Sequence, residues 1–420
     1  MEYKVQESCR ICGGSLKNVL KLGDIYPSNF VDKTEGKAVP LTLVECKLCG
    51  LVQLKYTVSL DSMYRNYFYQ SGINPSMVDS LQDVVTDIEN TVTINNDDIL
   101  IDIGCNDGTM FTLYKNKFAI KVGFDPALNL ADKAKENCDF FINDYFQNCN
   151  YPNVLGKAKV ITAIAMFYDL PNPNEFMECV NKLLVDDGIF VIQFTDLISM
   201  LKINAFDNIC HEHLEYYKLE DIVNLLAKYG LTVFKVSYNT VNGGSIRVFA
   251  CRNSTFPIEE SVLNSLMVER SYLTSYNNDP MKEFSTRVAD IKNTVINFLI
   301  RCQDAGLVVY GMGASTKGNT LLQYFGIRTG LIRKIAEVNK DKFGKFTIKT
   351  NIPIVSEDEA LSEYPDMFFL LPWHFLDDFI KRNIKFLEDG GAFVVPLPEP
   401  RLYYMEKGEV KWTLLEKVLA

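Results

Sequence analysis

The chain lacks long hydrophobic runs, an apolar start and an excess of basic residues. No stretch of 18 uncharged apolar residues occurs, and the first ten residues, MEYKVQESCR, are polar. We therefore expect neither export nor membrane insertion, and we predict a cytoplasmic location. The formal net charge of −10 disfavours nucleic acids and anionic membranes as partners, since both bind basic surfaces. A small-molecule substrate is expected instead.

The chain is too long for one ordinary hydrophobic core. Its 420 residues predict two to four domains, and 47% apolar with 23% charged residues is typical of a globular protein. The eleven cysteines are spread along the chain and follow no export signal. Most of them are therefore expected to be reduced thiols rather than a disulfide framework.

Two C-x2-C pairs near the N-terminus predict a metal site. Cys9 and Cys12 form one pair and Cys46 and Cys49 the other, with Gly50 placed as in a tight turn. Four thiolates suit a tetrahedral structural Zn(II), and they leave no position for a catalytic water. The alternative is four unrelated buried thiols. We interpret the pairs as a zinc site that stabilises the first fifty or so residues.

A strand, a glycine turn and a helix begin the central part of the chain. They are expected in ILIDIGCNDGTMFTLY (residues 99–114), and KVGFDPA (121–127) predicts a second strand that ends in Asp125. Glycines let the backbone approach a ligand, and an acid at this strand end can bind the hydroxyls of a ribose. The motif G-x-G-x-x-G is absent. D-x-G-x-N-D-G instead resembles motif I of the class I methyltransferases, which bind S-adenosylmethionine, although an ordinary turn is the alternative.

The following segments continue this α/β pattern. Residues 140–143 predict a short strand before Asp144, whose carboxylate can reach an adenine amine. VITAIAMFYDL and IFVIQFTDL predict the fourth and fifth strands, with a turn at 186–188 before the fifth. We therefore expect a class I methyltransferase core. Its expected cofactor-binding residues are Asp102, Gly104, Asn106, Asp125, Asp144 and Ala165.

The C-terminal part repeats the pattern of strand, glycine turn and helix. Residues 255–303 predict a helical connector, and LVVYGMGASTKGNTLL then carries Gly311, Gly313 and Gly318. Strands are expected at RKIAEVN, MFFLLPW and AFVVPLP, which together predict a second α/β sheet. Read alone, the turn suggests a dinucleotide site, but its third glycine falls two positions late for the usual motif.

Histidine is scarce, and its placement is uneven. Only three occur, at 211, 213 and 374, and the first two lie in NICHEHLEYY (208–217). His-Glu-His outside a helix is a metal site, a base with an orienting partner, or a polar turn. The usual helical spacing of zinc ligands is missing here. His374 follows a strand end, where ligands collect, but a structural role is equally compatible with it.

The motifs taken together resemble one family. The cysteine pairs, MYRNYFY (63–69), IDIGCNDGT, CHEHLEYY, NGGSIRVF and GMGASTKGNTLLQYFGI are similar, in this order, to the sugar C-methyltransferases. The best-known members methylate C3 of dTDP-4-keto-6-deoxy sugars. The resemblance implies a zinc-binding module (1–60), a methyltransferase domain (61–254), the helical connector (255–303) and a Rossmann-like sugar-nucleotide-binding domain (304–420). We expect a monomer.

The resemblance also implies roles for single residues. C-methylation requires removal of a proton next to a ketone, and a histidine is suited to this. The family's base maps to His213, with Glu212 beside it in the substrate pocket and His211 in the same motif. Tyr69 is expected to cover the cofactor, with Tyr67 as the alternative. The sugar nucleotide is assigned to Asn242, Ser315, Lys317 and Asn319, the last three at its diphosphate or nucleoside end.

Three positions depart from the family pattern. Many members have a tyrosine where this chain has Cys210, and often a histidine where it has Asp169 or Asn242. A thiol donates only weakly to an enolate oxygen, so the oxyanion partner is expected to differ. Tyr216 or its neighbour Tyr217 is an alternative phenol, unless both serve packing, and the two glycines after Asn242 also suit a simple hairpin turn.

Three functions follow from these observations. The first is an S-adenosylmethionine-dependent C-methyltransferase that acts on a nucleoside-diphosphate-linked 4-keto-deoxysugar through an enolate. The second is an O- or N-methyltransferase on a similar substrate. The third is a non-methylating or NAD-linked sugar-nucleotide-binding protein.

Overall fold

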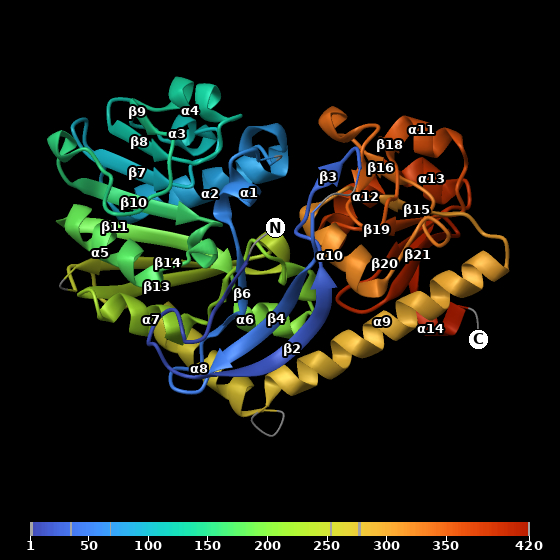
Figure 1. The fold of residues 1–420 in the computed structure, drawn as a ribbon. Helices are drawn as coiled ribbons and strands as arrows, with labels where there is room; N and C mark the ends of the chain where they lie inside the picture. Colours follow the sequence, from blue (N-terminus) through green and yellow to red (C-terminus); the bar gives the residue numbers. More distant parts are fainter. Residues whose placement is uncertain (1–2, 34–35, 68, 253, 276–278, 419–420) are drawn as a thin grey trace.

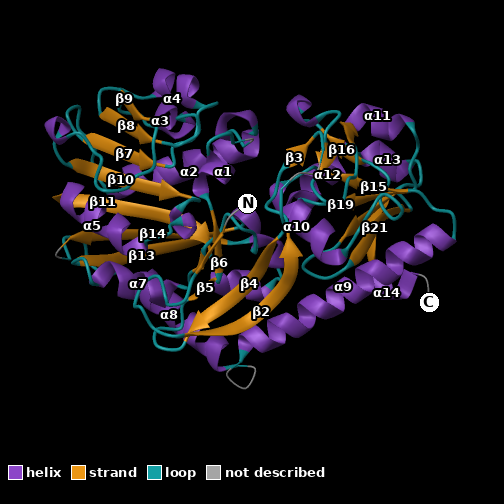
Figure 2. Cartoon of the chain, viewed as in Figure 1, coloured by secondary structure: helices purple, strands orange, loops and turns teal. Residues whose placement is uncertain are grey.

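Two seven-stranded sheets and one four-stranded sheet organise the chain (Figure 1). The computed structural model describes residues 3–33, 36–67, 69–252, 254–275 and 279–418. One seven-stranded sheet belongs to the central part of the chain and the other to its C-terminal part, while the smaller sheet lies between them. Helices cover these sheets, as the purple and orange elements of Figure 2 show.

The central sheet has the strand order β13-β14-β11-β10-β7-β8-β9. Its parallel part, β9-β8-β7-β10-β11, follows the order 3-2-1-4-5 of doubly wound sheets, and β14 and β13 close the far edge antiparallel. The first strand is buried at every position, as expected for a strand covered on both faces. The strands are β7 (Ile99–Ile103), β8 (Ile120–Phe124), β9 (Phe140–Ile142), β10 (Ala158–Ile164), β11 (Leu184–Thr195), β13 (Leu231–Asn239) and β14 (Ser245–Arg252).

Apolar helix faces cover both sides of this sheet. On one side Val84 and Ile88 of α2 pack in a cluster with Phe249, and on the other Val180 of α5 and Leu225 of α7 pack in a cluster with Phe190. The helices of this lobe are α1 (Leu60–Tyr64), α2 (Pro75–Thr91), α3 (Thr109–Leu113), α4 (Ala131–Asn137), α5 (Pro173–Leu183), α6 (Leu197–Lys202) and α7 (Leu219–Ala227).

The predicted turn at 186–188 lies inside a strand. β11 runs without interruption from Leu184 to Thr195. Its pairing with β10 jumps from Ala158–Leu184 to Val160–Ile189, so four residues of β11 bulge where a separate turn was expected. The prediction of a turn was wrong, because a bulge also accommodates a glycine without ending the strand.

The C-terminal sheet repeats the doubly wound order. Its strands run β18-β16-β15-β19-β20-β21-β22, parallel up to β20 and then closed by an antiparallel hairpin. They are β15 (Val309–Met312), β16 (Ile335–Glu337), β18 (Ile354–Ser356), β19 (Met367–Leu370), β20 (Ala392–Val395), β21 (Arg401–Glu406) and β22 (Glu409–Leu414). Its helices are α10 (Thr316–Phe325), α11 (Glu357–Ser362), α12 (Leu376–Arg382), α13 (Ile384–Glu388) and α14 (Leu415–Val418).

The small sheet connects the two lobes. It pairs β2 (Leu16–Ile25), β4 (Val39–Cys46) and β5 (Val52–Leu54) with β12 (Glu215–Tyr216), a strand from the middle of the chain. β3 (Phe30–Val31) reaches the C-terminal lobe and pairs with β17 (Phe346–Thr347). β1 (Tyr3–Val5) pairs with β6 (Tyr56–Val58). The N-terminal segment therefore touches both lobes.

Two helices link the large sheets. α8 (Glu260–Thr274) lies against the central lobe, and α9 (Pro280–Asp304) runs as one long helix beneath β2 to the C-terminal lobe (Figure 1). Nine apolar or proline residues of α9 are buried, which explains why a segment rich in polar residues stays helical. The four predicted domain ranges remain a prediction.

Two further findings concern the cysteines and membranes. Cys149 and Cys179 form a disulfide, which was not predicted from the sequence, and the nine other cysteines are free thiols. Across the described part of the chain, no helix has both the length and the apolar character needed to cross a bilayer.

Candidate active site

A cavity of about 710 Å³ is lined by residues of the central and C-terminal lobes and by residues 28–30 of the N-terminal segment. Its wall includes strand ends of the central sheet, the segment after α6, and the glycine turn of the C-terminal lobe. Parallel α/β sheets bind ligands at the carboxyl ends of their strands, and both large sheets direct those ends at this cavity. Of the predicted site residues it contains Tyr69, Asp102, Gly104, Asn106, Asp125, Asp144, Ala165, Glu212, His213, Asn242, Ser315 and Lys317.

The turn after β7 forms a cradle of backbone. Gly104 has φ +77° and Asn106 has φ 55°, a left-handed conformation that is uncommon for any residue but glycine. A Cβ on Gly104 would lie 2.9 Å from Cγ of Met166. Asp125 Oδ2 accepts the N–H of Asn106 at 2.8 Å. The second strand end therefore holds the turn open towards the cavity.

The aspartates at the ends of β7 and β8, Asp102 and Asp125, have raised pKa values. Burial raises the pKa of Asp125 to about 6, against hydrogen bonds from Ala127 and Asn106 that lower it. Burial also raises the pKa of Asp102 to about 7, although the Thr162 hydroxyl donates to it at 2.6 Å. Carboxylates with spare lone pairs in this position suit hydroxyl donors of a ribose.

Ala165 and Asp144 complete the wall on this side. Ala165 has φ 55°, at the point where the chain leaves β10, and donates its N–H to Gln193 O at 2.8 Å. Asp144 is half-exposed and pairs with Arg65 at 3.5 Å. The backbone of the turn after β7, together with Asp102 and Asp125, fits the expected S-adenosylmethionine.

Tyr67 and Tyr69 both line the cavity. Asn106 Nδ2 donates to Tyr69 O at 3.1 Å, which ties this segment to the cofactor turn. Asn129 holds the backbone of Tyr67 through two hydrogen bonds of 2.9 Å. The rings lie 6.3 Å apart. Phe68, within the same motif, falls outside the described residues.

His213 enters the cavity as a neutral imidazole. Its Nδ1 lies 2.8 Å from Asn208 O, and since a carbonyl only accepts, Nδ1 carries the proton. Nε2 has no hydrogen-bond partner among the described residues and keeps its lone pair. Burial, together with the positive charge of Lys317, lowers the pKa of His213 to about 3. Tyr168 packs on the ring with centroids 4.4 Å apart.

Two acids accompany this histidine. Burial raises the pKa of Glu212 and raises that of Asp169 well above its usual value. Each has an oxygen without a partner among the described residues, Oε2 of Glu212 and Oδ1 of Asp169. Tyr64 lies between them and donates to Glu212 O at 3.2 Å. Burial therefore disfavours the charged form of both acids beside His213.

Four predicted residues do not line the cavity. His211 is buried with Nε2 at 3.2 Å from Val39 O, and burial lowers its pKa to about 4. Tyr216 pairs with Val52 in the small sheet and donates to Asn208 O at 3.4 Å. Both side chains hold the segment against the small sheet, and the roles expected for them remain predictions. Cys210 lies behind Glu212, and its thiol is 3.7 Å from Asn208 O.

Asn319 is the fourth of these residues. Its side chain donates to Asn29 O at 3.2 Å, because the first turn of α10 faces the N-terminal segment on that side. Its expected contact with the sugar nucleotide remains a prediction.

The C-terminal lobe contributes Ser315, Lys317 and His374 to the cavity. Ser315 caps α10 by accepting the N–H of Gly318 at 2.9 Å. The ammonium of Lys317 donates to Asn242 O, in the connection between β13 and β14, at 3.3 Å. Burial, and then the charge of Lys317, lower the pKa of His374 to about 3.

Some cavity residues were not assigned from the sequence. Tyr64 and Tyr168 line the cavity, and Tyr168 packs on His213. Outside the lining, Trp373 Nε1 donates to Asp207 Oδ2 at 2.9 Å. Tyr64 belongs to a motif that the sequence already singled out. Asp207 and Trp373 carried no such signal, since their contact joins segments 166 residues apart.

The four N-terminal cysteines form a metal-sized cluster. Their Sγ atoms all lie within 4.8 Å of one another, and three pairs are 3.4, 3.5 and 3.6 Å apart. A tetrahedral Zn(II) with Zn–S of about 2.3 Å requires sulfurs about 3.8 Å apart. The N–H groups of Leu48 and Cys49 point at the Cys46 sulfur, at 3.3 and 3.5 Å. The donor set fits a structural zinc.

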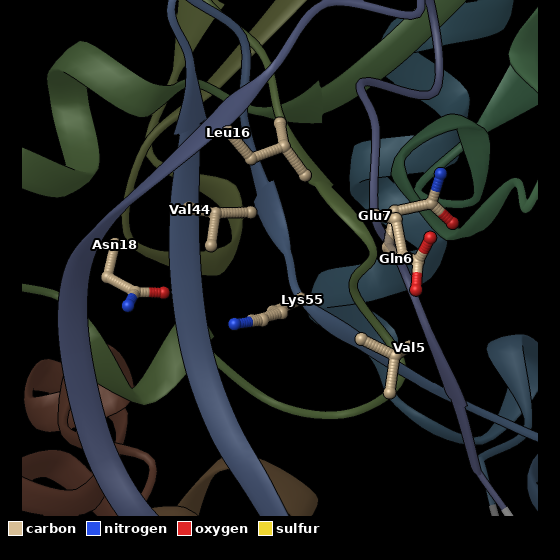
Figure 3. A pocket seen from close by; sticks show the side chains of 7 residues that line it. All are labelled: Val5, Gln6, Glu7, Leu16, Asn18, Val44 and Lys55. Atoms are coloured by element: carbon tan, nitrogen blue, oxygen red, sulfur yellow. The ribbon is translucent and has the colours of Figure 1, made fainter.

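A smaller cavity of about 340 Å³ opens beside β2 and β4 (Figure 3). Glu7 and Lys55 are the charged residues of its lining. The other lining residues are apolar or amides, so we assign no chemistry to it.

Models of known protein families match three successive ranges of the chain. A model of a C-methyltransferase C-terminal domain matches residues 240–398, one of a methyltransferase domain matches residues 78–236, and one of a zinc binding domain matches residues 9–64. The C-methyltransferase NovU of Streptomyces niveus is 30% identical over 410 residues, which cover 95% of this chain and 97% of NovU.

Solved structures with similarity to the chain are methyltransferases. The magnesium protoporphyrin IX methyltransferase of Synechocystis PCC 6803 with bound SAM is 16% identical, with a TM-score of 0.32, over 42% of this chain and 79% of its own. An S-adenosylmethionine-dependent methyltransferase of Clostridium acetobutylicum ATCC 824 is 13% identical, with a TM-score of 0.34, over 43% and 93%.

Proposed function

The chain belongs to the sugar C-methyltransferase family, and from this premise we propose that its acceptor is a nucleoside-diphosphate-linked 4-keto-deoxysugar. The reaction class follows from the family: the protein is an S-adenosylmethionine-dependent C-methyltransferase with a structural zinc. Within that class, the methyl group goes to the carbon next to the ketone, which we expect to be C3.

One observation carries this proposal: a neutral histidine with a free nitrogen faces the same cavity as the cofactor turn. A C–H bond next to a ketone is acidic enough for a histidine to break when the enolate is stabilised. Nε2 of His213 takes the proton, the C–H electron pair forms the enolate double bond, and the carbonyl pair moves to oxygen. S-adenosylmethionine supplies the electrophilic methyl that this carbon receives.

The other cavity residues have roles that follow from their positions. Asn208 O keeps the proton of His213 on Nδ1 and so keeps Nε2 available. Asp125 and Asp102 bind the ribose and hold the turn open, and Tyr69 covers the cofactor. Burial raises the pKa of Glu212 and disfavours its carboxylate form, so we assign it a hydrogen bond to the sugar rather than the role of the base. The C-terminal lobe receives the nucleotide.

A His213→Asn variant tests the base directly. Asparagine retains an N–H that can donate to Asn208 O but has no basic nitrogen, so the loop keeps its anchor. We expect C-methylation to fall by about 10²-fold or more, since general bases contribute about 10²–10⁴. Products are followed by NMR with dTDP-, CDP- and GDP-4-keto-6-deoxysugars, and S-adenosylmethionine affinity by calorimetry.

The outcomes separate base loss from misfolding. Unchanged S-adenosylmethionine affinity with lost turnover supports the assignment. Turnover close to that of the parent protein would remove His213 as the base. A product series without any new C-methyl signal would reject the 4-keto-sugar acceptor.

A further inference from the structure

Lys317 crosses from one lobe into the catalytic part of the other. It lies in the first turn of α10, yet its ammonium donates to Asn242 O in the central lobe at 3.3 Å. Beside it, a Cβ on Gly243 would lie 3.4 Å from the Trp373 ring, which itself holds Asp207. Lys317 and the segment that carries His213 are therefore fastened at one junction.

Lys317 is a half-buried cation that lines the cavity, and the carboxylate that acts on its charge is that of Asp207. In the described ranges, Lys317 makes no ion pair within 4.0 Å, and Asn242 O takes one of its three N–H donors. Arg382, the other basic residue that lines the cavity, makes two hydrogen bonds to Glu357 at 3.0 and 2.9 Å. Two N–H donors of the Lys317 ammonium remain for a ligand in the cavity, so Lys317 is placed to meet an anion of the bound substrate.

The neighbours of Lys317 indicate which anion this is. Its charge acts on His213, Cys210 and His374, and burial lowers its own pKa. The ketone oxygen is bonded to the carbon next to the one that His213 deprotonates, so it must lie beside that base. Burial disfavours the charged form of Glu212 and Asp169, so neither supplies a positive charge to the oxygen, and the Cys210 thiol is a weak donor.

We propose that Lys317 is a catalytic residue that donates to the ketone oxygen and stabilises the enolate formed by His213. The inference rests on the proposed function. In this step the C–H bond breaks, the proton moves to Nε2, and the negative charge develops on the oxygen next to the ammonium. Lys317 keeps its protons and acts by charge and hydrogen bonding. This role differs from the diphosphate contact expected from the sequence.

The test measures enolate formation apart from methyl transfer. The sugar that the parent protein methylates is incubated in D2O with S-adenosylhomocysteine, and NMR follows loss of the C–H signal next to the ketone. Lys317→Met, Lys317→Arg and, as matched control, Lys385→Met are compared, since Lys385 is exposed and pairs only with Asp389 in the same lobe. Calorimetry with the free nucleoside diphosphate tests the alternative role, in which Lys317 binds the diphosphate of the sugar nucleotide.

We expect exchange in Lys317→Met to fall by about 10²–10³-fold, with nucleoside diphosphate affinity within roughly twofold of the parent. Lys317→Arg retains the charge and should recover part of the exchange, and Lys385→Met should exchange like the parent. Parental exchange in Lys317→Met, or a loss confined to diphosphate affinity, would overturn the proposal and leave the proposed function standing. Absence of exchange in the parent protein itself would instead count against the enolate mechanism.

Discussion

At the scale of single residues, His213, the proposed base, shows how burial keeps an imidazole neutral. Its ordinary pKa would leave part of it protonated near neutral pH. The cavity penalises the imidazolium, and Lys317 adds repulsion, so the pKa falls to about 3. A negative charge on Glu212 or Asp169 would raise the pKa of His213. Burial disfavours that charge, because it raises the pKa of both acids.

This environment predicts the pH dependence of enolate formation. The active form of His213 is neutral and is lost as pH falls through its pKa. Because that pKa is about 3, deuterium exchange should stay nearly level as pH falls through 6.5, the value for a free histidine. Exchange rates between about pH 7.5 and 4.5 test this, with circular dichroism to confirm that the protein stays folded.

Lys317→Met provides the matching comparison. Loss of its positive charge removes one cause of the lowered pKa of His213, so the acidic fall in exchange should move to higher pH. A parent profile that already loses half its activity near pH 6.5 would contradict the buried, neutral His213 described here.

At the scale of elements, the small sheet supports the catalytic segment. β12 follows His213 directly and pairs with β5, Leu54 donates its N–H to Leu214 O at 2.8 Å, and Arg10 pairs with Glu215 at 3.3 Å. Arg10 lies between the first two zinc ligands. The cysteine cluster is therefore connected to the segment that carries His213 through the buried Arg10–Glu215 ion pair and the pairing of β5 with β12.

The Arg10–Glu215 pair is expected to position the catalytic segment. Either Arg10→Met or Glu215→Met leaves a buried polar partner unpaired and should lower the free energy of unfolding by about 3–5 kcal/mol. The double variant should lose less than the sum, since neither partner remains. Urea unfolding measures this, and the exchange rate should fall while S-adenosylmethionine affinity is kept.

An exposed pair in the same sheet serves as the control. Lys17 and Glu45 lie 3.0 Å apart with side chains 51% and 26% exposed, so Lys17→Met should cost about 1 kcal/mol or less. Equal losses for Lys17→Met and Arg10→Met would show that the buried pair has no special role.

At the scale of the whole molecule, three distant parts of the chain complete one cavity. The central sheet supplies the glycine turn after β7, the segment at 208–217 supplies His213, the proposed base, and the C-terminal lobe supplies Lys317. The segment at 26–31 touches α10, where Ser28 Oγ donates to Thr316 O at 2.7 Å. The N-terminal part thus contacts both the segment that carries His213 and α10 of the C-terminal lobe.

Removal of zinc should therefore impair the base before the cofactor site. Without the ion, the cysteine cluster and the strands after it lose their support, whereas β7 and β8 pair only within the central sheet. We expect exchange to fall by roughly tenfold or more on chelation, with S-adenosylmethionine affinity nearly kept. Chelator preloaded with zinc is the control. Parallel loss of both properties would show that zinc supports the whole fold.

The sequence alone was enough for the class of fold, the two sheets and the cofactor turn, because these depend on local patterns. Apolar runs, glycines and strand-end acids lie close together in the chain, and the C-x2-C spacing of the cysteine pairs indicates that they are metal ligands. The bulge at 186–188 was misread as a turn because one glycine is compatible with both.

Only the tertiary structure decided which side chains meet. His211 and His213 are two residues apart, but Val39 holds the first in the support while Asn208 turns the second into the cavity. Tyr216 and Asn319 likewise face their packing partners, and Lys317 reaches across to Asn242 O in the central lobe. The direction of a side chain depends on contacts between segments far apart in the chain, and local sequence does not encode them.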